Sequence, residues 1–204
     1  MYFNKTQKES IEKKIKEVEQ KSSAELVAVI SKKSDSYQYL GLLISLLFTV
    51  ILTSFLIIFS TLKSENILLT QVVVLVLLYV LFFYQTKLLL YLLPKSYKYS
   101  ISSKYANKNF ATLGLNSTQT KQAIMFYVSV EEKYVEIITD SSIKEKIPDS
   151  KWQDIVNVFI EDVKKENIYQ GYSKAINSCS EMLIEQFPVK NNDVNELRDE
   201  IIEL

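Results

Sequence analysis

Two long uncharged segments in the middle of the chain set the strongest limit on its fold. The 204-residue sequence carries no charge from Ser36 to Leu62, and a second apolar run extends from Asn66 to Thr86. About 20 helical residues cross a hydrocarbon core of about 30 Å. We therefore expect a transmembrane hairpin at residues 37–94, with spans at about 38–60 and 67–93. A buried helix pair in a soluble protein is the disfavoured alternative, because helices that are apolar on all sides are rare outside bilayers.

Small residues recur every four positions along the first span. Such a stripe lies on one helix face and lets a second helix approach closely. We expect this face to pack against the second span of the same chain, in preference to a second copy of the protein. The residues of this predicted packing face are Gly41, Ser45, Thr49 and Thr53.

Lysines are unevenly distributed around the two spans. The short connection between them carries Lys63, whereas Lys32 and Lys33 precede the first span and five more lysines follow from Lys87 onward. Because basic residues accumulate on the cytoplasmic side, both flanks are predicted to be cytoplasmic and the connection to lie outside. Each basic residue near anionic lipid contributes about 1 kcal/mol to surface binding. The predicted membrane-surface residues are Lys95, Lys98, Lys104 and Lys108.

The remaining sequence predicts one cytoplasmic α/β domain in two pieces, residues 1–36 and 95–188, followed by an acidic tail at 189–204. The segment 25–31 is apolar on both faces, which is typical of a central strand. A helix near 101–113 ends at Gly114, and two strand-like runs follow at 122–130 and 133–140. Amphipathic helices follow from Pro148 to Pro188, and the first helix of the chain begins with Asn4 or Thr6 as its cap. The order strand, helix, strand predicts one right-handed βαβ unit, in which the strands at 25–31 and 122–130 are parallel and the strand at 133–140 lies antiparallel beside them. The expected fold is a small mixed β-sheet covered by helices and interrupted by the hairpin. The tail is expected to form a short amphipathic helix or to stay mobile.

Three features of the composition exclude large classes of function. The chain has no histidine, three glycines and one cysteine. It therefore has no histidine-based catalytic triad, glycine-rich phosphate loop or cysteine-based zinc site. The formal net charge is zero, and no basic stripe indicates nucleic-acid binding.

The best polar cluster is predicted at the end of the sheet away from the membrane. Glu25 begins the first strand, and Asp140 ends the third strand, which is expected to run antiparallel to it, so the two carboxylates could approach each other. Asp149 follows at a helix start. Carboxylate and hydroxyl oxygens suit Ca²⁺ or Mg²⁺. The favoured alternative is structural, with Asp140 closing a turn and Asp149 capping a helix.

Several segments together resemble the TPM domain family. They are "KSSAELVAVIS", the hairpin and helix start "TKQAIMFYVSVEEKYVEIITDSSIKEKIPDSKWQDIVNVFI", and "YQGYSKAINSCSEMLIEQFP". They look more like a bacterial membrane branch of this family, in which two spans split the domain. The resemblance implies an α/β sandwich around a small sheet. It also implies diverse roles, with acid-phosphatase activity and divalent-cation binding proposed for some members.

The chain departs from the family pattern at two places that bear on this chemistry. Lys121-Gln122 stands where members commonly carry an acidic residue and Asn-Gly, and "DSSIKEKIP" replaces a glycine-rich loop. Both departures weaken a phosphatase or cation-binding assignment.

The favoured function is therefore a non-enzymatic interaction domain in the cytoplasmic (inner) membrane, with two passes, both termini cytoplasmic and no catalytic residue. It would assist the assembly or maintenance of membrane complexes. Its expected partners are the lipid bilayer and a membrane or cytoplasmic protein, with no nucleic acid and no cofactor other than Ca²⁺ or Mg²⁺. The alternative is a weak divalent-metal-dependent phosphatase using Asp140 and Glu25. A transporter subunit ranks last, because the spans contain no internal charge.

Overall fold

The computed structural model describes residues 2–165, 167–189 and 200–204. The chain divides into two compact units. The first unit joins Met1–Ser34 to Tyr99–Leu204, and the second contains Asp35–Lys98. The first unit is an α/β domain, and the second is a helical hairpin inserted into its sequence.

A mixed sheet lies at the centre of the α/β domain, with the strand order β3-β2-β1-β4. β1 pairs in parallel with β2, in a register that places Glu25 beside Ala123, and β2 pairs antiparallel with β3. The expected parallel pair with an antiparallel strand beside it is thus confirmed. The strands are β1 (Glu25–Ser31), β2 (Ala123–Ser129), β3 (Tyr134–Thr139) and β4 (Ile202–Glu203).

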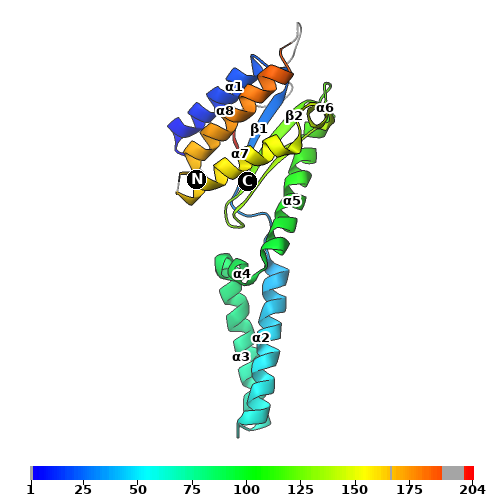
Figure 1. Ribbon diagram of the computed structural model, residues 1–204. Coiled ribbons are helices and arrows are strands. Elements are labelled where there is room, and N and C mark those ends of the chain that lie inside the picture. Colours follow the sequence, from blue (N-terminus) through cyan, green and yellow to red (C-terminus); the bar gives the residue numbers. More distant parts are fainter. Residues whose placement is uncertain (1, 166, 190–199) are drawn as a thin grey trace. The chain divides into compact units, whose positions relative to one another are not determined.

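Helices cover both faces of this sheet, which explains why every residue of β1 and β2 is buried (Figure 1). Side chains alternate between the faces along each strand. Leu26 and Phe126 pack under α1 (Lys5–Glu19), α7 (Asp149–Lys164) and α8 (Ile168–Gln186). Val27 and Met125 pack on the opposite face, together with Ala106 and Phe110 of α5 (Lys95–Thr112). The short helices η1 (Leu115–Ser117) and α6 (Ser141–Lys146) complete this unit.

The helix ends follow from local chemistry. Asn4 is the cap of α1: its Oδ1 accepts from the Gln7 amide at 2.8 Å, and the Gln7 side chain accepts from the Asn4 amide at 3.0 Å. This reciprocal pair satisfies two amides that the helix leaves open. Gly114 follows α5 with φ = 78°, a conformation that glycine adopts without steric cost.

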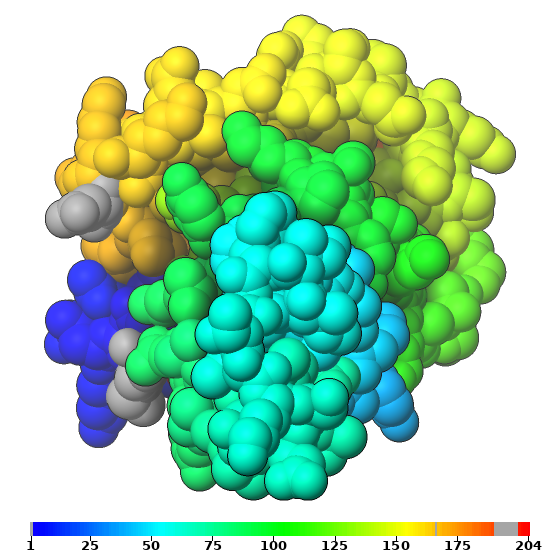
Figure 2. Space-filling model, turned by 90° about the horizontal axis from the view of Figure 1, so that it is seen from below, coloured from blue at the N-terminus to red at the C-terminus, as the bar shows by residue number. Residues whose placement is uncertain are grey.

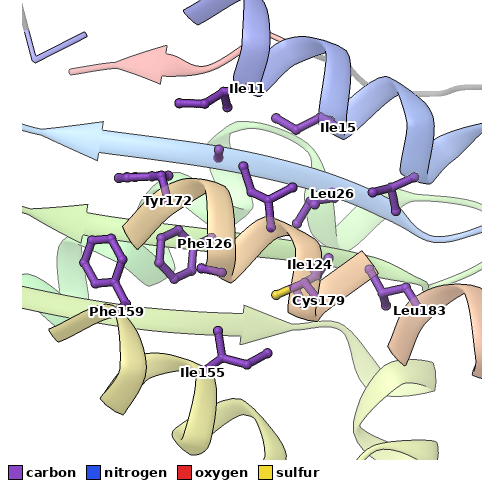
Figure 3. Packing of buried hydrophobic residues seen from close by; sticks show 14 of the residues in the cluster. Ile11, Ile15, Leu26, Ile124, Phe126, Ile155, Phe159, Tyr172, Cys179 and Leu183 are labelled. Carbon is purple, nitrogen blue, oxygen red and sulfur yellow. The ribbon is translucent and has the colours of Figure 1, made fainter. Parts of the chain in front are cut away.

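The core beneath α7 and α8 is built around three aromatic rings (Figure 3). Phe126, Phe159 and Tyr172 meet edge to face with ring centroids 5.0–5.4 Å apart. The Tyr172 hydroxyl donates to the carbonyl of Val29 at 2.9 Å, so its polar atom is satisfied inside the core. Gly171 lets α8 approach Phe159, because a Cβ there would lie 2.9 Å from a ring carbon of that residue.

The hairpin consists of α2 (Gln38–Phe59) and α3 (Ser64–Tyr84), followed by the short α4 (Thr86–Leu92). Figure 2 views the hairpin from the end of its tight turn, where the cyan and blue-green side chains of α2 and α3 lie in contact. The second apolar stretch is not one helix from 67 to 93 as expected. Its helix ends at Tyr84 because Gln85 leaves the helical region, with φ = −112° and ψ = 61°. The polar sequence Gln85-Thr86-Lys87 interrupts the apolar run at this point.

The acidic tail lies mostly outside the described residues. Where the structure resumes, Ile201 is 7% exposed and joins the core, and β4 extends the sheet beside β1. Lys8 forms an ion pair with Glu203 at 3.0 Å. The described part of the tail is therefore an edge strand, which differs from the expected helix or mobile segment.

Candidate functional site

The three carboxylates of the predicted acidic cluster occupy separate local environments. Glu25 pairs with Ala123 on β2, and the Asp140 amide donates to the Ala123 carbonyl at 2.9 Å. Both acidic residues therefore reach the same end of the sheet, but β2 lies between their strands. Neighbouring strands are spaced by about 4.8 Å, which puts the two backbones roughly 10 Å apart.

Asp140 and Asp149 each lie at a helix start. Asp140 is the cap of α6, where its Oδ1 accepts from the Ser141 amide at 2.7 Å. Asp149 is the first residue of α7, where its negative charge interacts favourably with the helix dipole. No group of three or more Asp, Glu or Cys side chains in the described part of the chain is arranged to hold a metal ion. Binding of Ca²⁺ or Mg²⁺ by Glu25, Asp140 and Asp149 stays a prediction.

The predicted membrane-surface lysines all lie on α5. Lys95, Lys104 and Lys108 are exposed, whereas the Lys98 ammonium donates to the carbonyl of Leu90 at 3.1 Å. A helix turns about 100° per residue, so Lys104 and Lys108 share one face and Lys95 and Lys98 share another. The spacing therefore does not place all four lysines on a single helix face.

The small-residue stripe of α2 is enclosed within the hairpin. Gly41, Ser45 and Thr49 are buried, and Thr53 is partly buried. A Cβ on Gly41 would lie 3.4 Å from the Cβ of Phe82, which shows how closely the end of α3 approaches. The hydroxyls of Ser45, Thr49 and Thr53 donate to the carbonyl four residues earlier at 2.7–2.8 Å, so they need no partner outside α2.

A buried network of hydroxyls was not anticipated from the sequence. Ser34, just before the chain enters the hairpin, places its Oγ 2.9 Å from the Tyr127 and Ser129 hydroxyls and 3.0 Å from that of Ser102 on α5. The Glu132 carboxylate accepts from the Ser34 amide at 2.9 Å and from the Ser129 hydroxyl. All five side chains are buried. The network thus fixes the chain where it leaves the domain and on the helix by which it returns.

The number of hydroxyl protons determines which group donates and which accepts in each hydrogen bond of this network. A hydroxyl carries one proton and accepts two hydrogen bonds. Ser129 donates to Glu132, so Ser34 donates to Ser129 and accepts from both Ser102 and Tyr127. Burial raises the pKa of the Tyr127 phenol, although its serine hydrogen bonds oppose this shift. Tyr127 therefore stays protonated and acts as a donor.

A second feature missed by sequence reasoning is a groove of about 510 Å³ along β3. β3 is one of the two edge strands of the described sheet, and it lies between α5 on one face and α7 on the other. Tyr99 forms part of the α5 wall and meets the Tyr134 ring at 5.2 Å. Trp152, Val156 and Ile160 line the α7 wall. The strand pattern of 134–139 was visible in the sequence, but its position at the edge was not.

The charged groups at this groove differ in their environments. Glu136 is half-buried, and burial raises the pKa of its carboxyl while a hydrogen bond from Ser103 at 3.2 Å opposes the shift. Burial also raises the pKa of the Tyr134 phenol beside it. Lys133, Lys144 and Asp149 line the groove as exposed groups. The groove therefore has a polar wall toward α5, and its α7 wall is apolar at Trp152, Val156 and Ile160 but also carries Gln153 and Asp149.

Neither region has the parts of a nucleophilic catalytic site. Cys179 is completely buried in the core, and burial raises the pKa of its thiol to about 12. A nucleophilic cysteine needs the opposite, an accessible thiol with a lowered pKa. The hydroxyls of the buried network have one another and a carboxylate as partners, an arrangement that orders a structure. What the described geometry offers chemically is a rigid domain with an open strand edge.

These features define the class of protein: a mixed α/β domain whose sequence is interrupted by an apolar helical hairpin. Residues 84–182, from the end of α3 into α8, match the family model of the TPM domain. The chain is thus similar to the TPM domain over these residues, and the two apolar helices precede the matched region. The resemblance seen in the sequence is confirmed over these residues, whereas the segment KSSAELVAVIS (Lys21–Ser31) lies outside the match.

A solved structure extends the comparison to the whole chain at the level of fold. The NMR structure of the BA42 protein from the psychrophilic bacterium Bizionia argentinensis aligns with a TM-score of 0.62 over 100% of this chain and 97% of that one. The two sequences are 17% identical, so the similarity concerns the fold alone. Curated protein sequences give no match.

Proposed function

We propose that this chain is an integral protein of the cytoplasmic membrane whose hairpin anchors a non-enzymatic TPM domain on the cytoplasmic side. The domain binds a membrane or cytoplasmic protein and serves in the assembly or maintenance of membrane complexes. Two independent observations support this proposal. The exposed apolar surface of the hairpin supports the membrane location. The open groove of the α/β domain, whose described residues form no catalytic site, supports the interaction role.

The exposure of the hairpin carries the membrane part of the proposal. Gln38–Phe59 and Ser64–Tyr84 have mean hydropathies of 2.8 and 2.6, yet only 11% of each apolar window is buried. A core helix of a soluble protein would be mostly buried. At about 1.5 Å per residue, helices of 22 and 21 residues are long enough for a hydrocarbon core of about 30 Å. An apolar surface of this extent is not left in water by soluble proteins.

The lysine distribution supports the orientation. The connection between the spans contains Lys63, whereas seven lysines flank the spans on the other side: Lys32, Lys33, Lys87, Lys95, Lys98, Lys104 and Lys108. Positive charge is retained on the cytoplasmic side during insertion. This distribution supports a connection on the outside and a TPM domain, with both termini, on the inside.

Cysteine labelling in intact cells tests insertion and orientation together. A membrane-impermeant maleimide is expected to label Ser64→Cys before lysis and Ser150→Cys only after lysis. Cys179 gives no background while the domain is folded, since it is fully buried. Labelling of Ser150→Cys but not Ser64→Cys in intact cells would reverse the orientation. Recovery of the protein in the soluble fraction would remove the membrane assignment.

A phosphatase assay tests the non-enzymatic part. Full-length protein in detergent is incubated with an aryl phosphate and millimolar Mg²⁺ or Ca²⁺, alongside the variant Asp140→Ala. We expect the two proteins to release phosphate at the same rate as buffer. Metal-dependent turnover that Asp140→Ala abolishes would replace the proposal with the phosphatase alternative.

A further inference from the structure

The outer edge of β3 presents backbone groups that no other described strand uses. The Asp140 amide points to β2, where it donates to Ala123. Because amide direction alternates along an antiparallel strand, the N–H and C=O groups of Val135, Ile137 and Thr139 point away from β2. β3 is the last strand of the sheet on this side in the described part of the chain. Three residues thus expose a row of donors and acceptors suited to one more strand.

This edge lacks the usual protection against strand pairing. Natural edge strands are blunted by proline, bulges or charged side chains. β3 has the sequence YVEIIT, and its one charged residue, Glu136, faces α5 and accepts from Ser103. An unprotected edge in a groove walled by α5 and α7 is a feature of domains that bind by strand addition.

The two walls specify the side-chain pattern of the added strand. Successive side chains of a strand point to opposite faces. On one face they would meet Val156 and Ile160 of α7, and on the other Tyr99 and Asn107 of α5. A fitting segment therefore alternates apolar residues toward α7 with polar residues toward α5.

The one tryptophan of the chain lies at the groove. Trp152 lines the groove and is 4% exposed, and its indole Nε1 has no hydrogen-bond acceptor among the described residues. Because Nε1 itself is inaccessible to solvent, a ligand in the groove would contact the exposed edge of the indole ring and not this donor.

Charge at the two ends of the groove selects among extended segments. Lys133 lies at the start of β3, and Lys144 lies near its end on α6, while Asp149 at the start of α7 is the exposed acidic group of the lining. Neither lysine forms a salt bridge within the described residues. Six strand residues extend about 20 Å, so acidic side chains about six residues apart would reach both lysines in either chain direction.

We propose that the groove along β3 binds an extended segment of a partner protein by β-strand addition. The segment alternates apolar and polar residues and carries an acidic residue at each end. A second copy of this chain is a poorer occupant, because its own β3 lies recessed between its own α5 and α7. The inference rests on the proposed role as an interaction domain and names the site and the chemistry of the partner.

The test uses the full-length protein in detergent micelles and peptides of about eight residues, with Glu at both ends and alternating Val and Thr between. Amide exchange followed by NMR should slow at least about tenfold at Val135, Ile137 and Thr139 on peptide addition. The fluorescence of Trp152, the one tryptophan of the chain, should change in parallel. A peptide N-methylated along the edge that faces β3 should not bind, and one N-methylated along the opposite edge should bind normally. Equal binding of both N-methylated peptides, or no slowing at millimolar peptide, overturns the proposal.

Two variants separate the backbone contribution from the charge contribution. Ile137→Pro removes an outward N–H that does not enter the ladder with β2, and proline is tolerated at such edge positions. It should weaken peptide binding about tenfold, the effect of losing one or two hydrogen bonds. The paired change Lys133→Glu with Lys144→Glu should weaken binding of the Glu-ended peptide and strengthen binding of a Lys-ended one. If the Lys133→Glu/Lys144→Glu protein binds both peptides with the affinities of the parent, the preference for acidic ends is refuted. This test does not depend on whether Ile137→Pro folds.

Photo-cross-linking in cells distinguishes failure of this inference from failure of the proposed function. The cross-linker is placed at Gln153 in the groove or at exposed Lys13 on α1 as the matched control. A protein captured from Lys13 but not from Gln153 leaves the interaction domain in place and removes the groove as its site. Capture from neither position contradicts the proposed function itself.

Discussion

Replacing Ser34 with alanine should destabilise the α/β domain strongly for so small a change. The Ser34 hydroxyl lies 2.9–3.0 Å from three other hydroxyls, and all of these groups are buried. A net contribution of about 0.5–1.5 kcal/mol per hydrogen bond gives roughly 1.5–4.5 kcal/mol for the three. Ser102 and Tyr127 would also lose the acceptor for their protons. We expect a loss of about 2–4 kcal/mol in the free energy of unfolding.

The fluorescence of Trp152 provides the measurement. This residue is the one tryptophan of the chain and is buried on α7, so its emission reports on the α/β domain and not on the hairpin. Full-length protein in detergent is heated, and the midpoint should fall by roughly 6–12 °C for a domain of this size. Ser150→Ala is the matched control, because Ser150 is exposed, and it should stay within about 0.5 kcal/mol of the parent.

A second variant examines the direction of the network. In Glu132→Gln the side-chain amide can donate to Ser129, and the chain of hydroxyls can reverse, since each hydroxyl both donates and accepts. What is lost is the extra strength of hydrogen bonds to a charged acceptor, about 1 kcal/mol. Glu132→Gln should therefore destabilise less than Ser34→Ala. A Ser34→Ala protein whose midpoint of thermal unfolding equals that of the Ser150→Ala control would refute the reasoning.

Three further outcomes are expected. Gly171→Ala should lower the free energy of unfolding by about 1–3 kcal/mol, because its Cβ would lie 2.9 Å from a carbon of the Phe159 ring; a Trp152 melting curve identical to that of the parent would contradict this. The Cys179 thiol has a pKa raised by burial to about 12, above its ordinary value of 9.0, so the folded state binds its proton more tightly. The stabilisation that comes from this raised pKa is fully present below pH 9 and is lost as the pH rises toward 12. Cys179→Ala should therefore reduce the dependence of the free energy of unfolding on pH between pH 9 and 12, and an unchanged slope would refute the assignment. The double variant Lys104→Gln/Lys108→Gln should weaken association of the domain with anionic bilayers by about 2 kcal/mol at low salt. The measurement is the solvent accessibility of a spin label placed at the neighbouring exposed Asn107, and Lys13→Gln is the control. Equal accessibility in the two variants would exclude these lysines as lipid contacts.

The sequence predicted the parts of this structure that depend on long or regular patterns. The hairpin followed from uncharged runs of more than 20 residues, and the central strands followed from segments that are apolar on both faces. The parallel pairing of β1 and β2 followed from the helix between them. Gly114 was recognisable as the end of α5, and its positive φ confirms that role.

What the sequence did not predict depends on partners that are distant along the chain. β4 contains two residues and exists because Ile202 pairs beside Val29. The hydroxyl network joins Ser34 to Ser102 and Ser129, and each serine alone resembles an ordinary surface residue. One signal was available: Ser31 and Ser129 end two strands that were expected to be parallel neighbours. Glu25 and Asp140 were expected to approach each other, and only the strand order places β2 between them.

The insertion of the hairpin between β1 and β2 affects co-translational folding. β1 cannot pair with β2 until the ribosome has synthesised the residues between Glu25 and its neighbour in the sheet, Ala123. At about 5–20 residues per second, this delay lasts roughly 5–20 s. During that time the newly made β1, apolar on both sides, has no sheet to join and is a target for chaperones. Under the proposed membrane anchoring, completion of the sheet waits for insertion of the hairpin, and a defect in that insertion would appear first as aggregation or proteolysis of the amino-terminal segment.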